Sequence, residues 1–312
     1  MKDNIELYGT VYNNAAQINA SINSIEECLG ADLHSINVVD NYSNDGTFEE
    51  LLKLEKKFGN IKIFRDRCKR GKGRDIALRA CSPGSIVTYV DFDSVYKEVF
   101  GELIRKGLNF VKEGKIVIAH NFALGYSEWF IKSGGWKNLN YGEDAEFFAR
   151  ILHGYPAVAV PVFVCINEKF GGERESRYAT GIRYLLRKLD CNLDYIVGSG
   201  KTLRETMGYY RAGGTGGVST KLRGAAGFLL YTVSFTRGKR RRYFSQDNYA
   251  VYNNAFVKFL KLPREMGITE KVPLIFSSSV KDEAIRRVSS LHPNILFMEL
   301  SDSDLTIGYE QE

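Results

Sequence analysis

The stretch Ile86–Tyr96 (IVTYVDFDSVY) decides the fold that this sequence predicts. Its first five residues have mostly strand-forming character and run directly into two aspartates separated by one residue. Because successive side chains of a strand point to opposite faces, Asp91 and Asp93 share one direction while Phe92 points into the core. Two carboxylates at the mouth of a buried strand suit a divalent cation that also binds phosphate oxygens. A strand that ends in an acidic turn is the alternative interpretation, since Asp is common in turns.

Strands and helices alternate on both sides of this stretch. Strands are predicted at Ile5–Tyr12, Ser35–Asp40, Ile61–Arg65, Lys115–Ala119 and Ala157–Cys165. Helices are predicted for the apolar stripe Ile18, Ile22, Ile25 and Leu29, for Phe48–Phe58 with Thr47 as its cap, for Arg74–Cys81 and for Glu98–Lys112. This alternation predicts an α/β fold with a mostly parallel sheet flanked by helices. Ligands of such sheets bind at the carboxyl ends of the strands, where Asn13, Asp40, Arg67–Gly73, Asp91 and Asp93 all fall.

The basic segment Lys69–Arg74 (KRGKGR) is a candidate for phosphate binding. Two glycines flank Lys72, and the helix predicted to start at Arg74 would add free backbone N–H groups for a diphosphate. The alternative is a solvated basic turn. Gly198–Thr202 (GSGKT) resembles the end of a P-loop, but the position of its first glycine is occupied by Tyr195, so the motif fails. The short run Gly213–Gly217 (GGTGG) is interpreted as a loop.

Two neighbouring carboxylates, Glu143 and Asp144, follow Gly142 at a predicted helix start. Acidic residues at this position favour the helix dipole and can bond the free N–H groups, which is the structural interpretation of the pair. Phe147 and Phe148 are expected to anchor the helix in the core.

Composition restricts the class of protein. The chain has 312 residues with 44% hydrophobic and 26% charged residues, which permits one large domain or two small ones. Its five cysteines are odd in number and lack CxxC spacing, which argues against a disulfide framework or a zinc cluster. The first residues show no signal-peptide pattern, and no apolar run approaches the ~20 residues that span a bilayer. A cytoplasmic protein is therefore expected.

The second half of the chain predicts helices at Ile182–Leu189 and Thr202–Arg211, after a charged connector at Glu168–Arg177. The apolar stretch Leu222–Thr236 then meets the basic run Arg237–Arg242 (RGKRRR), a composition typical of an interfacial membrane element. A core helix followed by a solvated loop is the alternative. No nucleic-acid module accompanies the basic run, so no nucleic-acid partner is predicted. A terminal β-α-β piece is expected at Pro273–Phe276, Val280–Ser290 and Ile295–Leu300.

The order of these parts resembles the family 2 glycosyltransferases, which are inverting enzymes of the GT-A fold. The matching segments are Thr10–Ile25 (TVYNNAAQINASINSI), Val38–Thr47 (VVDNYSNDGT), Arg70–Cys81 (RGKGRDIALRAC), Tyr89–Ser94 (YVDFDS) and Gly134–Tyr155 (GGWKNLNYGEDAEFFARILHGY). The resemblance covers about half of the chain. It implies a GT-A core over residues 1–166, with a nucleotide-binding half at 1–96 and an acceptor half at 97–166. Residues 167–312 would form a mainly helical C-terminal extension.

The resemblance also implies roles for individual residues. The residues implied to bind the nucleotide-sugar are Tyr12, Asn13, Asp40, Asn41, Arg70, Lys72 and Asp91. Asp91 and Asp93 would hold Mg²⁺ or Mn²⁺, and Asp144 would be the general base, with Glu143 beside it as the second catalytic candidate.

Three departures from the family pattern refine these expectations. Asn41 stands where the family often has a second aspartate that reads uracil, so a UDP donor is not implied. Residues 163–167 contain no histidine that could complete the metal site. The arginine–tryptophan motif of processive synthases is absent, which favours transfer of a single sugar.

The expected function is therefore metal-dependent, inverting transfer of one sugar from a nucleotide-diphosphate sugar to a hydroxyl of a glycan or lipid-linked acceptor. One alternative is a sugar-nucleotide nucleotidyltransferase, which should carry a glycine-rich arginine loop after the first strand, and Tyr8–Gln17 (YGTVYNNAAQ) has none. The other is a catalytically silent nucleotide-sugar binding protein, against which the intact Asp91, Asp93 and Asp144 argue. An anionic membrane surface at the cytoplasmic face is an expected further partner.

Overall fold

The computed structural model describes residues 3–166, 182–198, 202–212, 217–237 and 296–297. Up to residue 96 the elements are β1 (Ile5–Val11), α1 (Ala15–Leu29), η1 (Gly30–Asp32), β2 (Leu33–Asp40), α2 (Thr47–Phe58), β3 (Ile61–Arg65), α3 (Arg70–Arg79), β4 (Ile86–Tyr89) and β5 (Val95–Tyr96). Residues 98–166 form α4 (Glu98–Lys112), β6 (Ile116–His120), β7 (Phe122–Tyr126), α5 (Ser127–Lys132), α6 (Glu143–Gly154), β8 (Ala157–Phe163) and β9 (Cys165–Ile166). The later elements are α8 (Ile182–Gly198), α9 (Leu203–Ala212), α10 (Gly217–Ser234), η2 (Phe235–Arg237) and β10 (Leu296–Phe297).

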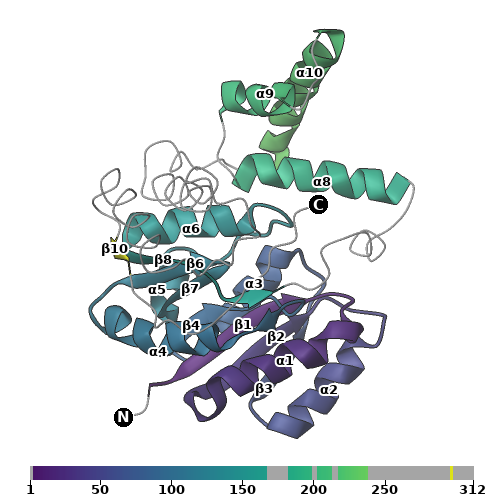
Figure 1. Ribbon diagram of the computed structural model, residues 1–312. Helices are drawn as coiled ribbons and strands as arrows, with labels where there is room; N and C mark the ends of the chain where they lie inside the picture. The colour runs from purple at the N-terminus through teal and green to yellow at the C-terminus, as the bar shows by residue number, and fades with distance from the viewer. Residues whose placement is uncertain (1–2, 167–181, 199–201, 213–216, 238–295, 298–312) are drawn as a thin grey trace, which may run out of the picture.

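The main sheet has the strand order β10-β8-β6-β7-β4-β1-β2-β3. Within it β7 runs antiparallel to both of its neighbours, and the other pairings are parallel. A second, two-stranded sheet pairs β5 with β9. The prediction of an α/β fold with a mostly parallel sheet is confirmed, and Figure 1 shows helices on both faces of it.

Two hydrophobic cores lie on the two faces of the sheet, and the helices that cover them differ. The apolar residues of α1, α2 and α4 pack in one core and those of α3, α5 and α6 in the other. Figure 1 shows where these helices lie around the sheet. The predicted stripe of α1 is confirmed, because Ile18, Ile22, Ile25 and Leu29 are all buried. Complete burial of each such side chain contributes roughly 1.5–3 kcal/mol, so the 3.6-residue periodicity sets which face of the helix meets the sheet.

Helix α3 begins at Arg70, four residues earlier than predicted, so residues 70–74 are helical and do not form a loop ahead of the helix. Close packing explains its two glycines. A Cβ atom at Gly71 would lie 1.9 Å from the Lys137 carbonyl oxygen, and one at Gly73 would lie 2.4 Å from Thr10 Oγ1. The Gly71 N–H donates to the Leu139 carbonyl, 2.9 Å away, and is therefore already used within the protein.

Two smaller predictions also need correction. Thr47 is the first residue of α2 and does not cap it; Gly46, with φ of 97°, precedes the helix. The Thr47 hydroxyl instead donates to Asp45 and accepts the Asn14 N–H. Strand β7 was not predicted, and it forms a hairpin with β6 through Asn121, whose φ is 53°.

The predicted helices of the second half are confirmed at α8 and α9, and α8 extends nine residues beyond its predicted end at Leu189, to Gly198. The apolar stretch from Leu222 lies in α10 and η2. No helix among the described residues is long and apolar enough to cross a bilayer. The predicted connector Glu168–Arg177, most of the Arg237–Arg242 run and the segments Pro273–Phe276 and Val280–Ser290 lie outside the described residues.

Candidate active site

A cavity of about 250 Å³ opens where the central strands β1 and β4 end. It is lined by Thr10, Val11, Tyr12, Asn14, Asn41, Cys68, Arg70, Asp91, Phe92, Asp93, Asn140 and Arg187. The carboxyl ends of parallel strands are the expected ligand site of such a sheet, and the cavity lies there.

Asp91 and Asp93 follow β4 and both line the cavity. Phe92 between them is 2% exposed, as the alternation of side chains predicts. The backbone here is held from both sides. The Asp91 N–H donates to the buried Tyr96 hydroxyl at 2.8 Å, and the Asn14 side-chain amide donates to the Phe92 carbonyl at 2.6 Å. The two carboxylates therefore sit on a fixed turn.

Arg74 of α3 connects Asp91 with the acidic pair. Its guanidinium is buried and bonds Asp91 Oδ1 at 2.5 Å through Nη2, and Glu143 Oε1 at 3.2 Å through Nη1. The rings of Tyr89 and Trp136 lie 4.8 and 4.7 Å from it. Burial alone would lower the pKa of Arg74, but the charges of Asp91 and Glu143 raise it above its ordinary value. Arg74 therefore stays charged, and its two bonds fix the position of Asp91 relative to Glu143.

The acidic pair divides into a buried and a partly exposed carboxylate. Glu143 is 2% exposed and forms ion pairs with Arg70 and Arg74, both at 3.2 Å. Asp144 is the second residue of α6 and is half-buried. Gly142, with φ of 73°, precedes the helix, which has no side-chain cap, so neither carboxylate acts as its N-cap. Asp144 lies outside the residues that line the cavity, although its charge adds to the effect of burial in raising the pKa of Tyr89.

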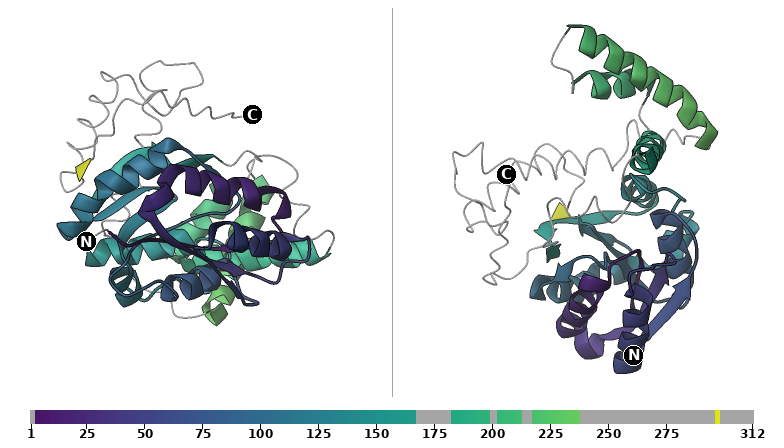
Figure 2. Two further views of the ribbon diagram at one scale, coloured as in Figure 1. Left: turned by 90° about the horizontal axis from the view of Figure 1, so that it is seen from below. Right: turned by 90° about the vertical axis from the view of Figure 1, so that its right-hand side faces the viewer.

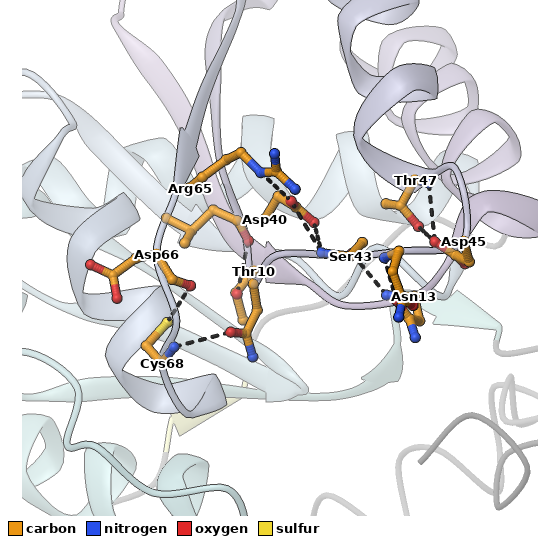
Figure 3. Close-up of polar contacts among 12 residues, drawn as sticks. Thr10, Asn13, Asp40, Ser43, Asp45, Thr47, Arg65, Asp66 and Cys68 are labelled. Atoms are coloured by element: carbon orange, nitrogen blue, oxygen red, sulfur yellow. Dashed lines mark hydrogen bonds and ion pairs between the residues drawn. The ribbon is translucent and has the colours of Figure 1, made fainter. Parts of the chain in front are cut away.

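Asp40 and Asn13 hold the loop after β2 in place through the polar contacts drawn in Figure 3. Neither residue lines the cavity. Asp40 is fully buried, pairs with Arg65 at 2.9 Å and accepts the Ser43 N–H at 3.1 Å. The Asn13 N–H donates to Ser43 Oγ at 2.9 Å, and its side-chain oxygen accepts the Asn44 N–H at 3.0 Å. Asn13 adopts a φ of 47°, which its side-chain bond to the neighbouring loop stabilises.

Tyr12 and Asn41 line the cavity and also an adjoining open groove of about 550 Å³. The groove is lined by Tyr12, Asn41, Tyr42, Arg67, Cys68, Lys69 and Asn138. Tyr42 is 45% exposed, with the guanidinium groups of Arg65 and Arg67 at 4.6 and 5.1 Å from its ring. The groove thus presents aromatic faces beside positive charge.

Arg70 and Lys72, both expected near a diphosphate, are placed differently. Arg70 lines the cavity. Lys72 lines neither the cavity nor the groove; it is 46% exposed and pairs with Asp75 at 3.5 Å within α3. The helical course of residues 70–73 turns Lys72 away, a consequence of the early start of α3.

Cys68 is the thiol that lines the cavity, and it is protonated near neutral pH. Burial, aided by the charge of Asp66, raises the pKa of Cys68 to about 11. Its thiol donates to the Asp66 carbonyl at 3.5 Å, and its N–H donates to the Asn41 side chain at 3.0 Å (Figure 3). Because the thiolate is the reactive form, Cys68 is a poor nucleophile here.

The chemistry of Asp91 and Asp93 fits a hard divalent cation. Mg²⁺ bound together with substrate phosphates usually takes one or two protein carboxylates and keeps several waters. Asp91 and Asp93 supply this number of carboxylates at the cavity. In the part of the chain that the structure describes, no group of three or more His, Cys, Asp or Glu residues is arranged to hold a metal.

The structure adds residues to the site that the sequence did not predict. Thr10, Asn14, Asn140 and Arg187 line the cavity, and Arg74 lies directly behind it. For Arg74, the available signal was an arginine in the segment before the two aspartates. For Arg187 no local signal exists, since it lies 94 residues beyond Asp93.

The comparisons with known proteins match the first half of the chain to a family model. The model of glycosyl transferase family 2 matches residues 10–160. No curated protein matches the chain significantly.

Among solved structures, the mannosyltransferase PcManGT from Pyrobaculum calidifontis, in complex with GDP-Man and Mn²⁺, is 15% identical; 94% of this chain and 88% of that chain are covered, with a TM-score of 0.47. S. aureus TarS 1-349 is 12% identical, with 76% and 93% covered and a TM-score of 0.45. Glucosyl-3-phosphoglycerate synthase from Mycobacterium tuberculosis, in complex with Mn²⁺, UDP and glucosyl-3-phosphoglycerate, is 14% identical, with 51% and 69% covered and a TM-score of 0.43.

Proposed function

Because residues 10–160 belong to glycosyl transferase family 2, we propose that this glycosyltransferase moves a single sugar from a nucleotide-diphosphate sugar to an acceptor hydroxyl, with inversion. The observation that carries the proposal is the cavity that brings Tyr12, Asn41 and Arg70 together with Asp91 and Asp93. A nucleotide, a diphosphate and a cation each find suitable partners among these residues. The proposed acceptor is a glycan or a lipid-linked acceptor.

The groove beside the cavity is the proposed site of the nucleobase. Stacking of a base on an aromatic ring contributes roughly 1–3 kcal/mol and tolerates different bases. Tyr12 and Tyr42 offer such rings, and Arg67 adds positive charge. The position of Asp40, buried against Arg65, supports an indirect role in which it shapes the loop that carries Asn41 and Tyr42.

The proposed reaction is a direct displacement at the sugar carbon. When bound by Asp91 and Asp93, Mg²⁺ or Mn²⁺ would act as a Lewis acid that stabilises the charge on the leaving diphosphate. Arg70 lines the cavity and adds a positive charge there. The raised pKa of Cys68 disfavours a covalent intermediate on this thiol.

Asp144 is the proposed general base, and Glu143 has a different proposed task. A base must be able to approach the acceptor hydroxyl. Glu143 is buried and paired with two arginines, which supports a positioning role. Asp144 is half-buried at the start of α6, which supports its candidacy as the base.

Replacement of Asp93 by Ala should weaken binding of the nucleoside diphosphate in Mn²⁺ by about 10-fold or more, because one of two cation ligands is lost. Asp93 is only partly buried, so the melting temperature should change little. A thermal-shift panel of UDP-, GDP- and dTDP-sugars with Mn²⁺ first identifies the donor, since ligand binding stabilises the native state. Titration calorimetry of the matching diphosphate, with and without EDTA, then measures the effect.

The control is Asp66→Ala, which removes an exposed carboxylate close to the site that lines neither cavity nor groove. It should bind like the wild type. Binding by Asp93→Ala that equals the wild type and ignores EDTA would exclude the metal role of this pair.

Product analysis separates the alternative functions. A glycosyltransferase releases a nucleoside diphosphate from the donor, whereas a nucleotidyltransferase releases pyrophosphate from a nucleoside triphosphate and a sugar phosphate. A silent binding protein would bind the donor and release neither product.

Helix α10 supports a further proposal, an association with an anionic membrane surface on the cytoplasmic side. The hairpin of α9 and α10 projects away from the sheet (Figures 1 and 2). Gly224 and Gly227 of α10 contact α9, where added Cβ atoms would lie 2.6 Å from Arg211 and 3.0 Å from Tyr210. The rest of α10 exposes large apolar side chains, namely Leu222, Phe228, Leu229 and Val233. Lys221 and Arg223 are exposed and lie beside Leu222 in the first half of α10.

Neutralisation of Arg240–Arg242 should release the protein from vesicles that contain phosphatidylserine, because each basic residue contributes about 1 kcal/mol at such a surface. Leu229→Ser should weaken the same binding, since Leu229 is 65% exposed on α10. Co-sedimentation with vesicles of phosphatidylserine and phosphatidylcholine, against phosphatidylcholine alone, measures both. Equal pelleting of the wild type and the neutralised variant would refute the electrostatic contribution, and no pelleting of either would refute the association.

A further inference from the structure

Helix α8 lies beyond the residues that match the family model, yet it contributes to the wall of the cavity. Arg187 of α8 lines the cavity together with Arg70, Asp91 and Asp93. Positions 187, 190 and 194 are three and four residues apart, so their side chains share one face of the helix. The other two members of this face, Asp190 and Asp194, hold α8 against the catalytic half of the chain.

The contact between α8 and the cavity wall is a compact set of charge-assisted bonds. Lys69 Nζ lies 2.8 Å from Asp194 and 3.1 Å from Asp190. Asp194 is 0% exposed, and its Oδ2 also accepts the Asn140 N–H at 2.8 Å. The Asn140 side chain donates to Asp190 at 3.3 Å and its residue lines the cavity. We name Lys69, Asn140, Asp190 and Asp194 the α8 latch.

A second contact places the end of α8 on the residue before the acidic pair. A Cβ atom at Gly198 would lie 2.5 Å from the Gly142 carbonyl oxygen, and the rings of Tyr141 and Tyr195 are 5.4 Å apart. Leu193, Ile196 and Val197 are buried along this part of the helix. This packing explains the glycine at position 198, the first residue of the GSGKT segment, because a larger residue would not fit there. It also defines the position of Arg187, because both ends of the carboxyl-terminal half of α8 are held.

The charge of the cavity indicates what Arg187 binds. Arg70 and Arg187 bring two guanidinium groups to a cavity of about 250 Å³ whose carboxylates are Asp91 and Asp93. A guanidinium presents parallel N–H donors that match the oxygens of a phosphate, and such bonds are about twice as strong as neutral ones. The pair of arginines thus suits an anion with several oxygens.

We propose that α8 is a component of the active site and that its Arg187 binds a phosphate group of a substrate. For the identity of the substrate this inference rests on the proposed function. The phosphate has two sources, the diphosphate of the donor or a phosphate carried by the acceptor. The cavity position of Arg187 is the same in either case.

The test compares Arg187→Gln and Arg187→Lys with the wild type and with Arg204→Gln, which removes an exposed arginine of α9 that does not line the cavity. Titration calorimetry measures binding of the nucleoside diphosphate with Mn²⁺. If Arg187 holds the donor, Arg187→Gln should weaken this binding by about 10-fold, Arg187→Lys should weaken it less, and Arg204→Gln should have no effect.

The second titration adds inorganic phosphate to the free protein and to the protein saturated with nucleoside diphosphate. If Arg187 holds an acceptor phosphate, the diphosphate affinity stays unchanged, while Arg187→Gln abolishes phosphate binding to the saturated protein. Affinities for both ligands that match those of Arg204→Gln would overturn the proposal and leave the proposed function standing. A wild type that binds phosphate through Arg187 but no nucleoside diphosphate would overturn the proposed function alone. A wild type that binds neither ligand overturns both.

The α8 latch supplies an independent check through Asp194→Asn. This change weakens the pairing with Lys69, so Arg187 should lose its position and diphosphate or phosphate binding should fall as in Arg187→Gln. Asp194→Asn and Arg187→Gln would remove the same contact between Arg187 and the phosphate. The variant with both changes should therefore bind the ligand no more weakly than whichever single variant has the lower affinity. Fully additive losses would show that the latch does not act through Arg187.

Discussion

Asp144→Asn should lower kcat by about 10²–10⁴ while leaving the affinity for the donor nearly unchanged, because an amide keeps the shape of the side chain but cannot take a proton. The stability should change little, since α6 begins after Gly142 without a side-chain cap and Asp144 is only half-buried. Steady-state kinetics with the identified donor and acceptor, together with calorimetry of donor binding, measure the two quantities separately.

Glu143→Gln is the companion variant, because the two carboxylates are adjacent. It should lower the free energy of unfolding, since Arg70 and Arg74 both pair with Glu143 in a buried setting. Its kcat should fall less than that of Asp144→Asn once the protein is folded. A turnover close to the wild type in Asp144→Asn would end its assignment as the base, and a large loss of kcat in Glu143→Gln alone would move that role to Glu143.

Arg74→Met should lower the free energy of unfolding by about 3–5 kcal/mol, because it breaks a buried ion pair, and should also abolish metal-dependent nucleotide binding. The methionine fills similar space but leaves Glu143, which is 2% exposed, with Arg70 as its remaining ion-pair partner. Asp91 loses the bond that orients it. Chemical denaturation measures the first effect and calorimetry the second.

Two further variants make the result on Arg74 specific. Arg79→Met removes an arginine of the same helix that is 49% exposed and pairs with Asp75. This change should lower the free energy of unfolding by less than about 1 kcal/mol. Arg74→Lys keeps the charge but has no fork of donors to bond Asp91 and Glu143 together, so it should not restore nucleotide binding. Wild-type nucleotide affinity in a folded Arg74→Met protein would contradict the positioning role.

Local patterns in the sequence determined most elements of the fold and the position of the paired aspartates. The stripe from Ile18 to Leu29 and the strand before Asp91 are periodic over a few residues, and burial of their apolar faces follows from that period alone. The alternation of these elements predicted a mostly parallel sheet with a site at the carboxyl ends of its strands. The structure contains this sheet, and the cavity lies at the ends of β1 and β4.

The tertiary structure alone decided which polar residues reach the cavity. Helix α3 begins at Arg70, and its glycines Gly71 and Gly73 allow close packing against Lys137 and Thr10. Lys72 of the same turn pairs with Asp75 and does not line the cavity. Asp40 turns toward Arg65 and Ser43 in the same way, so a strand-end carboxylate holds a loop.

The remaining contacts that the sequence did not predict join residues that are distant in the chain. Arg74 bonds Asp91, 17 residues away, and Glu143, 69 residues away, while Lys69 bonds Asp194 across 125 residues. No periodicity or local spacing of the sequence encodes such pairs. A charged side chain needs an ion-pair partner once folding has removed the water around it, and that partner is set by the tertiary structure. The sequence by itself therefore determined most of the strands and helices and the two aspartates. The tertiary structure decided strand β7, the start of α3, the network behind the aspartates and the entry of α8 into the cavity.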